Sequence, residues 1–328
     1  MSQEDAIALI ERGQRFLVAC HRRPDADALG SALGLAEVLR AFGKEVAIFV
    51  PDALPLSLRF LARDDILREA PEGPFDASFV MDTASTALLP KGLPGPEVRG
   101  PLVVVDHHAS HDDVGDLVVR NVNACATGEV VMDLAEALGV RPVPGAAATP
   151  LYAALVADTG GFRYPATHAK SLRLGAELLE AGADPWTVAY ELFEGWPTAR
   201  LQLLSAILDT LELHEEGRLA LLRVTRAMLA DAGADDDMVE GMVNYGRMIR
   251  GVEIAVLLWE FPADDDPDRI ETKVSLRSAG ELDVSRIAVR FGGGGHRSAA
   301  GAQSPGSLDE VGVEIRRAAA QLLADPEG

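Results

Sequence analysis

The chain has 328 residues, 48% of them hydrophobic and 25% charged, and its 30 Lys and Arg against 51 Asp and Glu give a formal net charge of −21. This length and apolar fraction suffice for two hydrophobic cores, so two domains are expected. The negative charge argues against an extended binding surface for long nucleic acid, because such binding needs many contacts between cations and phosphates. No apolar run reaches the roughly 18–20 residues of a membrane span, and the acidic first residues do not resemble a secretory signal. A cytoplasmic protein without membrane partners is expected.

The first part of the chain alternates short apolar runs with helical patterns, which is typical of βα units and a mainly parallel sheet. Strands are expected at residues 15–20, 44–50, 77–81 and 102–105, and helices at 27–42, 128–138, 146–157 and 169–181. The two cysteines, Cys20 and Cys125, are too far apart for a disulfide framework or a zinc finger. The predicted fold class is α/β.

The last part of the chain reads as a smaller α+β domain. A helix is expected at 198–211, strands at 218–224, 252–261 and 270–278, and a closing helix at 307–323. We therefore expect a first domain over residues 1–186, a helical connection over 187–215 and a second domain over 216–328.

A turn after the first expected strand carries His21, Asp25 and Asp27. Ligands of open α/β folds gather at the carboxyl edge of the sheet, where this turn lies. The two aspartates alternate around Ala26, which suits two carboxylates aimed into one cavity. For Asp27 alone, capping of the following helix is an equally good interpretation.

The same placement recurs at two more strands and one helix. Asp82 follows the strand at 77–81, and Asp106, His107 and His108 follow the strand at 102–105. Asp158 ends an apolar helix before two glycines, where the helix dipole does not favour a carboxylate. Each of these residues alone reads as structural. Together, His and Asp groups converging on one edge would repel and desolvate one another unless a cation held them.

Oxygen donors with two imidazoles suit Mn²⁺ or Mg²⁺, and the imidazoles favour Mn²⁺. The candidate ligand set is His21, Asp25, Asp27, Asp82, His107 and Asp158, which is enough for two ions. Paired ions stabilise the entering and leaving oxygens of an in-line phosphoryl displacement and lower the pKa of a water molecule. The reaction expected from these residues is phosphoester hydrolysis.

In the second domain, four glycines at residues 292–295 precede His296 and Arg297. A flexible turn is one interpretation, and a loop whose backbone N–H groups approach an anion is the other. The segment 272–303 carries five Lys and Arg (Lys273, Arg277, Arg286, Arg290 and Arg297) against Glu281 and Asp283, a local charge of +3. This basic patch in an acidic chain favours an anion site.

At this point the motifs resemble the DHH/DHHA1 phosphoesterase family. They are His21 to Asp27 with the following Ala-Leu-Gly-Ser, Asp82, Asp106-His107-His108, Asp158-Thr159-Gly160 and the terminal Gly-Gly-Gly-His, in the family's order. The resemblance implies a two-domain enzyme with two Mn²⁺ ions. It assigns His21 and Asp25 to one ion, Asp27, His107 and Asp158 to the other, and Asp82 as the bridge.

The resemblance also implies roles beyond the ligands. His108 would face the scissile phosphate, with Asp106 supporting the ligand set, as the catalytic pair. Substrate phosphate or the terminal nucleotide would bind residues Gly293, Gly294, Gly295, His296 and Arg297. Arg250 is a weaker candidate for that role, and an exposed charge at a strand edge is the alternative.

Within the family the chain looks most like bacterial nanoRNases that also act as phosphatases of 3′-phosphoadenosine 5′-phosphate (pAp). The implied substrates are short RNA or DNA oligonucleotides, pAp and linear dinucleotides such as pApA. A single-strand exonuclease of RecJ type, a cyclic-dinucleotide phosphodiesterase and a nucleotide-binding sensor remain alternatives. The glycine run argues against a family II pyrophosphatase, and a homodimer stays open.

Overall fold

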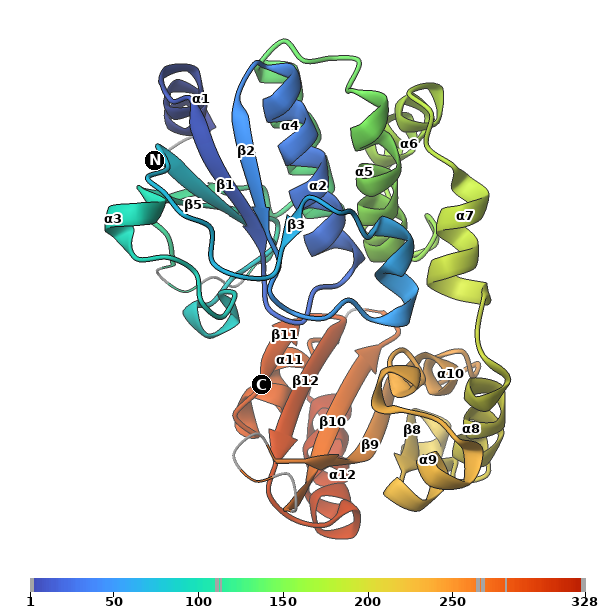
Figure 1. The fold of residues 1–328 in the computed structure, drawn as a ribbon. Helices are drawn as coiled ribbons and strands as arrows, with labels where there is room; N and C mark the ends of the chain where they lie inside the picture. The colour runs from blue at the N-terminus through green and yellow to red at the C-terminus, as the bar shows by residue number, and fades with distance from the viewer. Residues whose placement is uncertain are drawn as a thin grey trace. The chain divides into compact units, whose positions relative to one another are not determined.

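The computed structural model describes residues 3–109, 112, 114–263, 266, 269–280 and 282–325. It divides the chain into two compact units, Met1–Gly195 and Trp196–Gly328, and each unit is built on its own six-stranded sheet (Figure 1). Within the described residues, no helix combines the length and the apolar character that crossing a membrane requires.

The sheet of the first unit, predicted to be mainly parallel, is parallel throughout. Its strands lie in the order β3 (Ile66–Leu67), β2 (Glu45–Phe49), β1 (Arg15–Cys20), β4 (Ala77–Met81), β5 (Leu102–Asp106) and β6 (Leu117–Arg120). The chain moves outward from β1 to β3, returns to β4 beside β1, and then moves outward the other way. The reversal makes the carboxyl ends of β1 and β4 the place where open α/β sheets bind ligands.

One face of this sheet is covered by helices and the other mainly by irregular chain. The larger core lies under α1 (Gln3–Arg12), α2 (Ala26–Ala41), α4 (Thr127–Ala137) and α5 (Gly145–Asp158) (Figure 1). The opposite face holds a smaller cluster, against which Leu89 and Leu93 pack. The turn η1 (Leu56–Leu61) contributes Leu58 and Leu61 to the larger core, and the short elements η2 (Thr86–Leu88) and α3 (Pro96–Arg99) lie in the connections between strands. Helices α6 (Ala169–Glu180) and α7 (Pro185–Ala189), with the π-helical turn η3 (Tyr190–Glu194), end the unit.

Helices α2 and α5 pack with almost no space between their backbones. A Cβ atom on Gly30 of α2 would lie 2.3 Å from the carbonyl oxygen of Pro150 in α5, and one on Gly34 would lie 2.4 Å from the side chain of Leu151. Gly128 at the start of α4 is equally confined, because its Cβ would lie 2.7 Å from that of Ala154. Small residues thus let three helices meet beside the carboxyl edge of the sheet.

The second unit contains a mixed sheet with helices on both faces. Its strands lie in the order β11 (Gly294–His296), β12 (Ala299–Ser304), β10 (Ile270–Ser278), β9 (Ile254–Pro262), β8 (Leu219–Val224) and β7 (Glu212–His214), and only the pair β8 and β9 is parallel. One core includes α11 (Ser285–Arg290) and α12 (Leu308–Ala324), and the other includes α8 (Thr198–Leu208), α9 (Arg226–Ala232), η5 (Asp236–Val239) and α10 (Val243–Arg247). The short turn η4 (Glu215–Gly217) joins β7 to β8.

The predicted α/β class and the α+β second domain are confirmed, and most predicted elements agree with the structure within two residues. The helix expected over 198–211 was too long, because it ends at Leu208 and Glu212 already pairs with β8. Strands β3, β6, β7, β11 and β12 were not predicted. They are short or rich in glycine and alanine, so pairing with neighbouring strands forms them rather than a local apolar pattern.

Candidate metal centre

The six expected ligands gather at the carboxyl edge of the first unit's sheet. They form two groups in which one donor atom of each residue lies within 4.8 Å of the others: His21, Asp25 and Asp82 in one, and Asp27, His107 and Asp158 in the other. β1, β4 and β5 supply the residues that follow strand ends, α2 supplies Asp27 from its first turn, and Asp158 is the last residue of α5. The close packing of α2 on α5 brings Asp27 and Asp158 together.

In the first group, the imidazole of His21 faces two carboxylates. Nε2 of His21 lies 3.6 Å from Oδ2 of Asp82 and 3.8 Å from Oδ2 of Asp25. The other ring nitrogen, Nδ1, lies 2.9 Å from the carbonyl oxygen of Arg22. A carbonyl only accepts hydrogen bonds, so Nδ1 carries a proton and Nε2 is directed at the carboxylates.

The second group repeats this arrangement. Nδ1 of His107 lies 3.2 Å from the carbonyl oxygen of Ala124, and Nε2 lies 3.1 Å from Oδ2 of Asp158 and 3.6 Å from Oδ2 of Asp27. Metal-binding histidines usually donate their second ring N–H to a carbonyl or carboxylate, which fixes the tautomer. Both imidazoles therefore have the orientation that a metal ligand needs.

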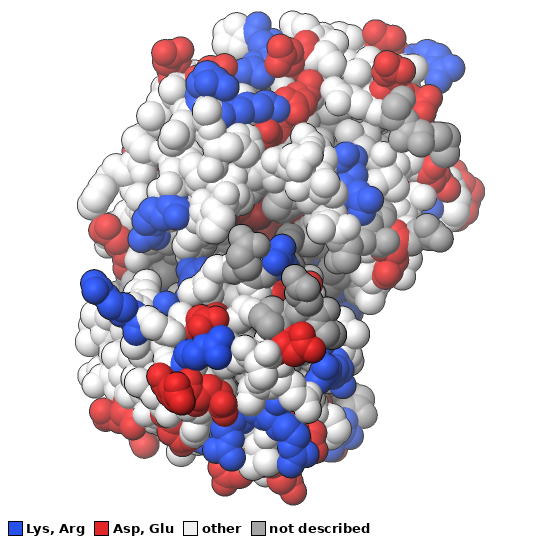
Figure 2. Space-filling model, turned by 180° about the vertical axis from the view of Figure 1, so that it is seen from behind, with Lys and Arg blue, Asp and Glu red and all other residues white. Residues whose placement is uncertain are grey.

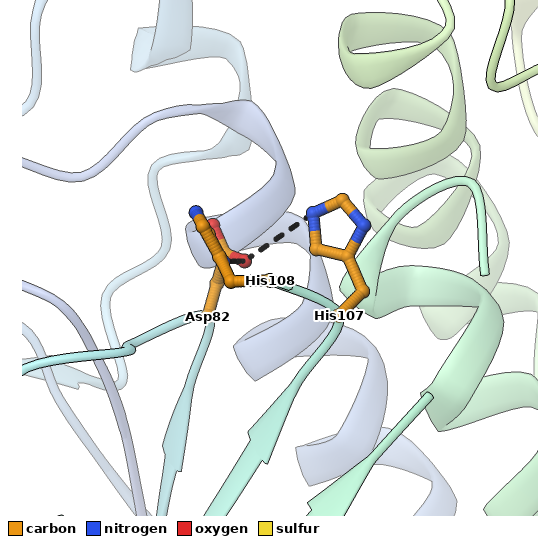
Figure 3. Close-up of side chains that lie close together, drawn as sticks. All are labelled: Asp82, His107 and His108. Atoms are coloured by element: carbon orange, nitrogen blue, oxygen red, sulfur yellow. Dashed lines mark ion pairs between the residues drawn. The ribbon is translucent and has the colours of Figure 1, made fainter. Parts of the chain in front are cut away.

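Asp82 joins the two groups. Oδ2 faces His21, while Oδ1 lies 3.7 Å from Nε2 of His107 and 3.4 Å from Nδ1 of His108 (Figure 3). Its backbone has a φ of +57°, a left-handed conformation that costs energy for a residue other than glycine but is tolerated best by Asp and Asn. The strained turn aims one carboxylate at both imidazoles.

The pKa values of the ligands depend on two opposing effects, burial and the charges of neighbouring groups. Burial, followed by the charges of Asp82 and Asp158, raises the pKa of Asp27 well above its usual range. Burial opposes protonation of His107, yet Asp158 and Asp27 raise its pKa to about 11. For Asp82 burial is likewise the largest influence, but His108 and His21 outweigh it and hold the pKa well below normal. Four converging carboxylates thus need nearby positive charge, which divalent ions can supply.

Burial and charge also act on the remaining members of the two groups. Burial opposes the charged form of His21, but interactions with Asp25 and Asp82 raise its pKa well above normal. Burial raises the pKa of Asp158 more strongly than the ion pair with His107 lowers it. With four carboxylates and two oriented imidazoles, the donors fit two hard or borderline divalent ions.

His108 has a different environment from its neighbour. Its Nδ1 lies 2.7 Å from Oδ1 of Asp106, which is fully buried and also accepts the backbone N–H groups of His107 and His108. Burial opposes a charged imidazole, but Asp106 and Asp82 raise the pKa of His108 to about 10. Asp106 therefore orients an imidazole that can carry a proton beside the two groups.

The capping interpretation of Asp27 was wrong in detail. Asp25 is the residue that caps α2, accepting the N–H of Ala28 at 2.9 Å. Asp27 instead accepts the N–H groups of Thr127 and Gly128 at 2.7 and 3.0 Å, so it caps α4 across the fold. The two carboxylates join different groups, which Asp82 links.

Sequence reasoning missed the residues that hold the ligands from behind, chiefly Thr127 and Glu129. The hydroxyl of Thr127 donates to Oδ1 of Asp82 at 2.9 Å, and Glu129 accepts the N–H of Cys125 at 3.1 Å. A threonine before a helix reads as a local cap, and a glutamate in a first turn reads as a favourable charge. Neither pattern signals a long-range contact.

A separate group of potential ligands, Cys125, Glu129 and His168, does not have the properties of a metal site. Nδ1 of His168 accepts the N–H of Ser171, so Nε2 carries the proton and points at Oε2 of Glu129, 3.2 Å away. The ammonium of Lys170 lies 3.0 Å from the other oxygen of Glu129. These partners already neutralise the buried carboxylate.

The glycine run of the second unit leads from a turn at Gly292 into a strand. Gly294–His296 form strand β11, which pairs with Ala299–Gly301 of β12, and the structure describes only the backbone of His296. A Cβ on Gly293 would lie 2.0 Å from the carbonyl oxygen of Gly301, and one on Gly295 would lie 2.6 Å from that of Ala299. The close approach of two strands requires these glycines, so the flexible-turn interpretation was wrong for Gly293 and Gly295.

The basic residues of the second unit are distributed over several elements. Lys273 places its ammonium 4.7 Å from the ring centroid of Trp259, and Arg290 donates to Gln321 at 2.9 Å. Arg250 lies in an exposed turn before β9 rather than at a strand edge, and Glu281 lies outside the described residues. On the face drawn in Figure 2, basic and acidic side chains are interspersed on the surface of both units. This distribution agrees with a solvated acidic surface.

Comparisons with known proteins give the class of this protein. The DHH family N-terminal domain matches residues 15–157, and the DHHA1 domain matches residues 218–325. The chain is 34% identical to the Thermus thermophilus "Bifunctional oligoribonuclease and PAP phosphatase NrnA" over 93% of its length and 89% of the relative's. Identity to the protein of that name from Bacillus subtilis is 30%, over 94% and 92% of the two chains. The chain belongs to the DHH/DHHA1 phosphoesterase family and is a phosphoester hydrolase, as the motifs predicted.

Two further similarities extend this result. The "Cyclic-di-AMP phosphodiesterase PdeA" of Listeria monocytogenes is 24% identical over 90% of this chain but only 45% of the relative. Among solved structures, the exopolyphosphatase-related protein of Bacteroides fragilis has a TM-score of 0.84 and 25% identity, covering 97% of this chain and 95% of that one. Phosphoesterases of this family are metal-dependent, in keeping with the acidic and imidazole groups described above.

Proposed function

We propose that this protein is a di-manganese phosphoesterase that hydrolyses very short oligonucleotides, linear dinucleotides such as pApA, and the 3′-phosphate of pAp. The observation that carries the proposal is the pair of three-residue groups joined by Asp82. Relatives that span nearly the whole chain are named for the same two activities. Mg²⁺ is the alternative metal, and the cytoplasm is the expected location.

The proposed ligands are His21 and Asp25 for one ion, Asp27, His107 and Asp158 for the other, and Asp82 for both. Two divalent ions held by these residues would lower the pKa of a water molecule and stabilise charge on the entering and leaving oxygens. Because four carboxylates surround the centre, the ions also make an otherwise negative site attractive to phosphate.

The remaining residues have proposed roles in substrate chemistry. His108 faces the scissile phosphate, and Asp106 holds its Nδ1 proton so that Nε2 is available for the phosphate or the leaving oxygen. Substrate phosphate or the terminal nucleotide binds the 293–297 segment of the second unit, with Arg250 as a secondary contact. A net charge of −21 disfavours long polymers, so substrates with few phosphates are preferred.

The direct test is to incubate the purified chain and Mn²⁺ with RNA of two to five nucleotides, pAp, pApA and a 24-mer, with and without EDTA. We expect rapid, EDTA-sensitive turnover of the short substrates and slow turnover of the 24-mer. Absence of metal-dependent hydrolysis of every short substrate would refute the proposal. Fast digestion of the 24-mer would instead favour an exonuclease of RecJ type.

A cyclic-dinucleotide phosphodiesterase is the second candidate, because relatives of that name match 90% or more of this chain. Adding cyclic di-AMP to the same assay distinguishes the two, and its hydrolysis faster than that of pApA would favour the second candidate. Tight binding of either nucleotide without product would indicate a sensor.

A further inference from the structure

Residues 124–128, here called the bracing turn, contact three of the six proposed ligands from behind. The backbone N–H groups of Thr127 and Gly128 donate to the two oxygens of Asp27 at 2.7 and 3.0 Å. The carbonyl of Ala124 accepts from Nδ1 of His107 at 3.2 Å. One short segment thus orients ligands that come from α2 and from the end of β5.

Thr127 adds a side-chain contact to these backbone contacts of the bracing turn. Its hydroxyl donates to Oδ1 of Asp82 at 2.9 Å, and the residue is fully buried. Without access to water, the hydroxyl proton has the carboxylate as its partner, and losing it would leave Asp82 with fewer donors. The bond also restricts rotation of a carboxylate whose other oxygen faces His21.

Glu129 connects the bracing turn to the start of α6. This carboxylate is 2% exposed and accepts the N–H of Cys125 at 3.1 Å. Lys170 Nζ at 3.0 Å and His168 Nε2 at 3.2 Å bind its two oxygens from the start of α6. A buried carboxylate whose oxygens are held by several partners favours one geometry, so Glu129 helps to hold the turn in place.

We propose that Thr127 is a positioning residue that orients Asp82 between the two metal groups and so couples the binding of the two ions. This inference rests on the proposed function, because it concerns how the same centre holds its metals. Hydrogen bonds to ligating carboxylates and imidazoles typically change metal affinity by about 10–100-fold when they are removed. A threonine with only a structural role would affect folding stability and leave metal affinity unchanged.

The test uses the full chain and compares Thr127→Val, which keeps the shape and removes the hydroxyl, with Thr127→Ser, which keeps the hydroxyl. Thr272→Val is the matched control, since Thr272 is also buried and its hydroxyl donates to the carbonyl of Gly306, far from the ligands in sequence. Calorimetric titration with Mn²⁺ measures affinity and stoichiometry, and electron paramagnetic resonance detects spin coupling between two bound ions. Circular dichroism checks folding of each metal-free variant.

We expect Thr127→Val to bind at least one ion about 10–100-fold more weakly and to lose the spin-coupled signal. Thr127→Ser and Thr272→Val should retain both. If the valine variant fails to fold, Thr127→Ala is measured in its place with the same expectation. Wild-type affinity in the folded valine or alanine variant, or an equal loss in the serine variant, would overturn the inference.

The wild-type chain separates failure of this inference from failure of the proposed function. If it binds two ions but hydrolyses no short oligonucleotide, the proposed function is wrong while the affinity comparison still decides the role of Thr127. If it binds no divalent ion, both are wrong.

Discussion

Nε2 of His107 lies 3.1 Å from Oδ2 of Asp158, at the junction of the end of β5 with the end of α5. Burial alone would lower the pKa of His107, but Asp158 and Asp27 raise it to about 11. In the metal-free protein this nitrogen therefore carries a proton at neutral pH. A metal ion and that proton compete for the same lone pair.

The first prediction is that affinity for Mn²⁺ rises with pH between 6 and 8. Because the pKa of His107 lies above this range and that of Asp27 is raised, metal binding must release protons. Each proton displaced changes the affinity by up to about tenfold per pH unit. Calorimetric titrations in buffers of different ionisation enthalpy measure both affinity and proton release. An affinity independent of pH, with no proton released, would contradict the proposed role of His107.

The second prediction concerns Asp82, the proposed bridging ligand. Asp82→Asn removes the charge and keeps a side chain that tolerates the backbone φ of +57°. We expect kcat to fall by about a thousandfold or more, since both ions lose a ligand, while the metal-free chain stays folded because asparagine has nearly the shape of aspartate and tolerates the same backbone conformation. Initial rates with pApA and thermal unfolding measure the two effects. Asp64→Asn, at an exposed turn of the same unit, is the control, and wild-type activity in Asp82→Asn would refute the assignment.

The third prediction is that the two adjacent histidines have different roles, one in metal binding and one in catalysis. His107→Asn should lower the affinity or number of bound ions, because His107 is a proposed ligand. His108→Asn should keep two ions and lower kcat by about 10²–10⁴-fold, the usual contribution of a positioned acid or base. Metal analysis of the dialysed variants, paired with steady-state kinetics, separates the two roles. Loss of metal in the His108 variant would make it a ligand.

The fourth prediction tests the packing that brings Asp27 to Asp158. A Cβ at Gly30 would lie 2.3 Å from the carbonyl oxygen of Pro150, so Gly30→Ala should push α2 from α5. Overpacking of this kind costs about 1–3 kcal/mol of unfolding free energy, and the displaced Asp27 should weaken metal binding. Gly145→Ala is the control on α5, where the nearest atom lies at 3.3 Å. Urea unfolding of both metal-free variants measures the difference, and equal stabilities would contradict the packing argument.

Much of the fold and of the candidate centre was predictable from local pattern. Buried parallel strands are short, continuous apolar runs, and β1 and β4 begin and end where the sequence predicts. The residues after those strands, such as His21 and Asp82, are polar where the apolar run stops. Because parallel strands align their carboxyl ends, strand ends alone predict that such side chains meet.

Contacts between segments distant in the chain were not predictable in this way. Asp27 looks like a cap of its own helix, yet the N–H groups it accepts belong to α4, a hundred positions later. The glycines at 293 and 295 look like a flexible loop, yet the carbonyls of β12 exclude any side chain there. In both cases the deciding partner is brought in by the folded chain.

The sequence by itself therefore determined the kind of chemistry: oxygen and imidazole donors, in family order, at the ends of buried strands. The resemblance that the motifs carry also implied how these donors divide between two ions, with Asp82 as the bridge. Only the tertiary structure decided which atoms face one another and that Thr127 braces Asp82. The physical reason is that residue type sets what a side chain can bind, whereas orientation depends on hydrogen bonds and packing from segments that no local pattern connects.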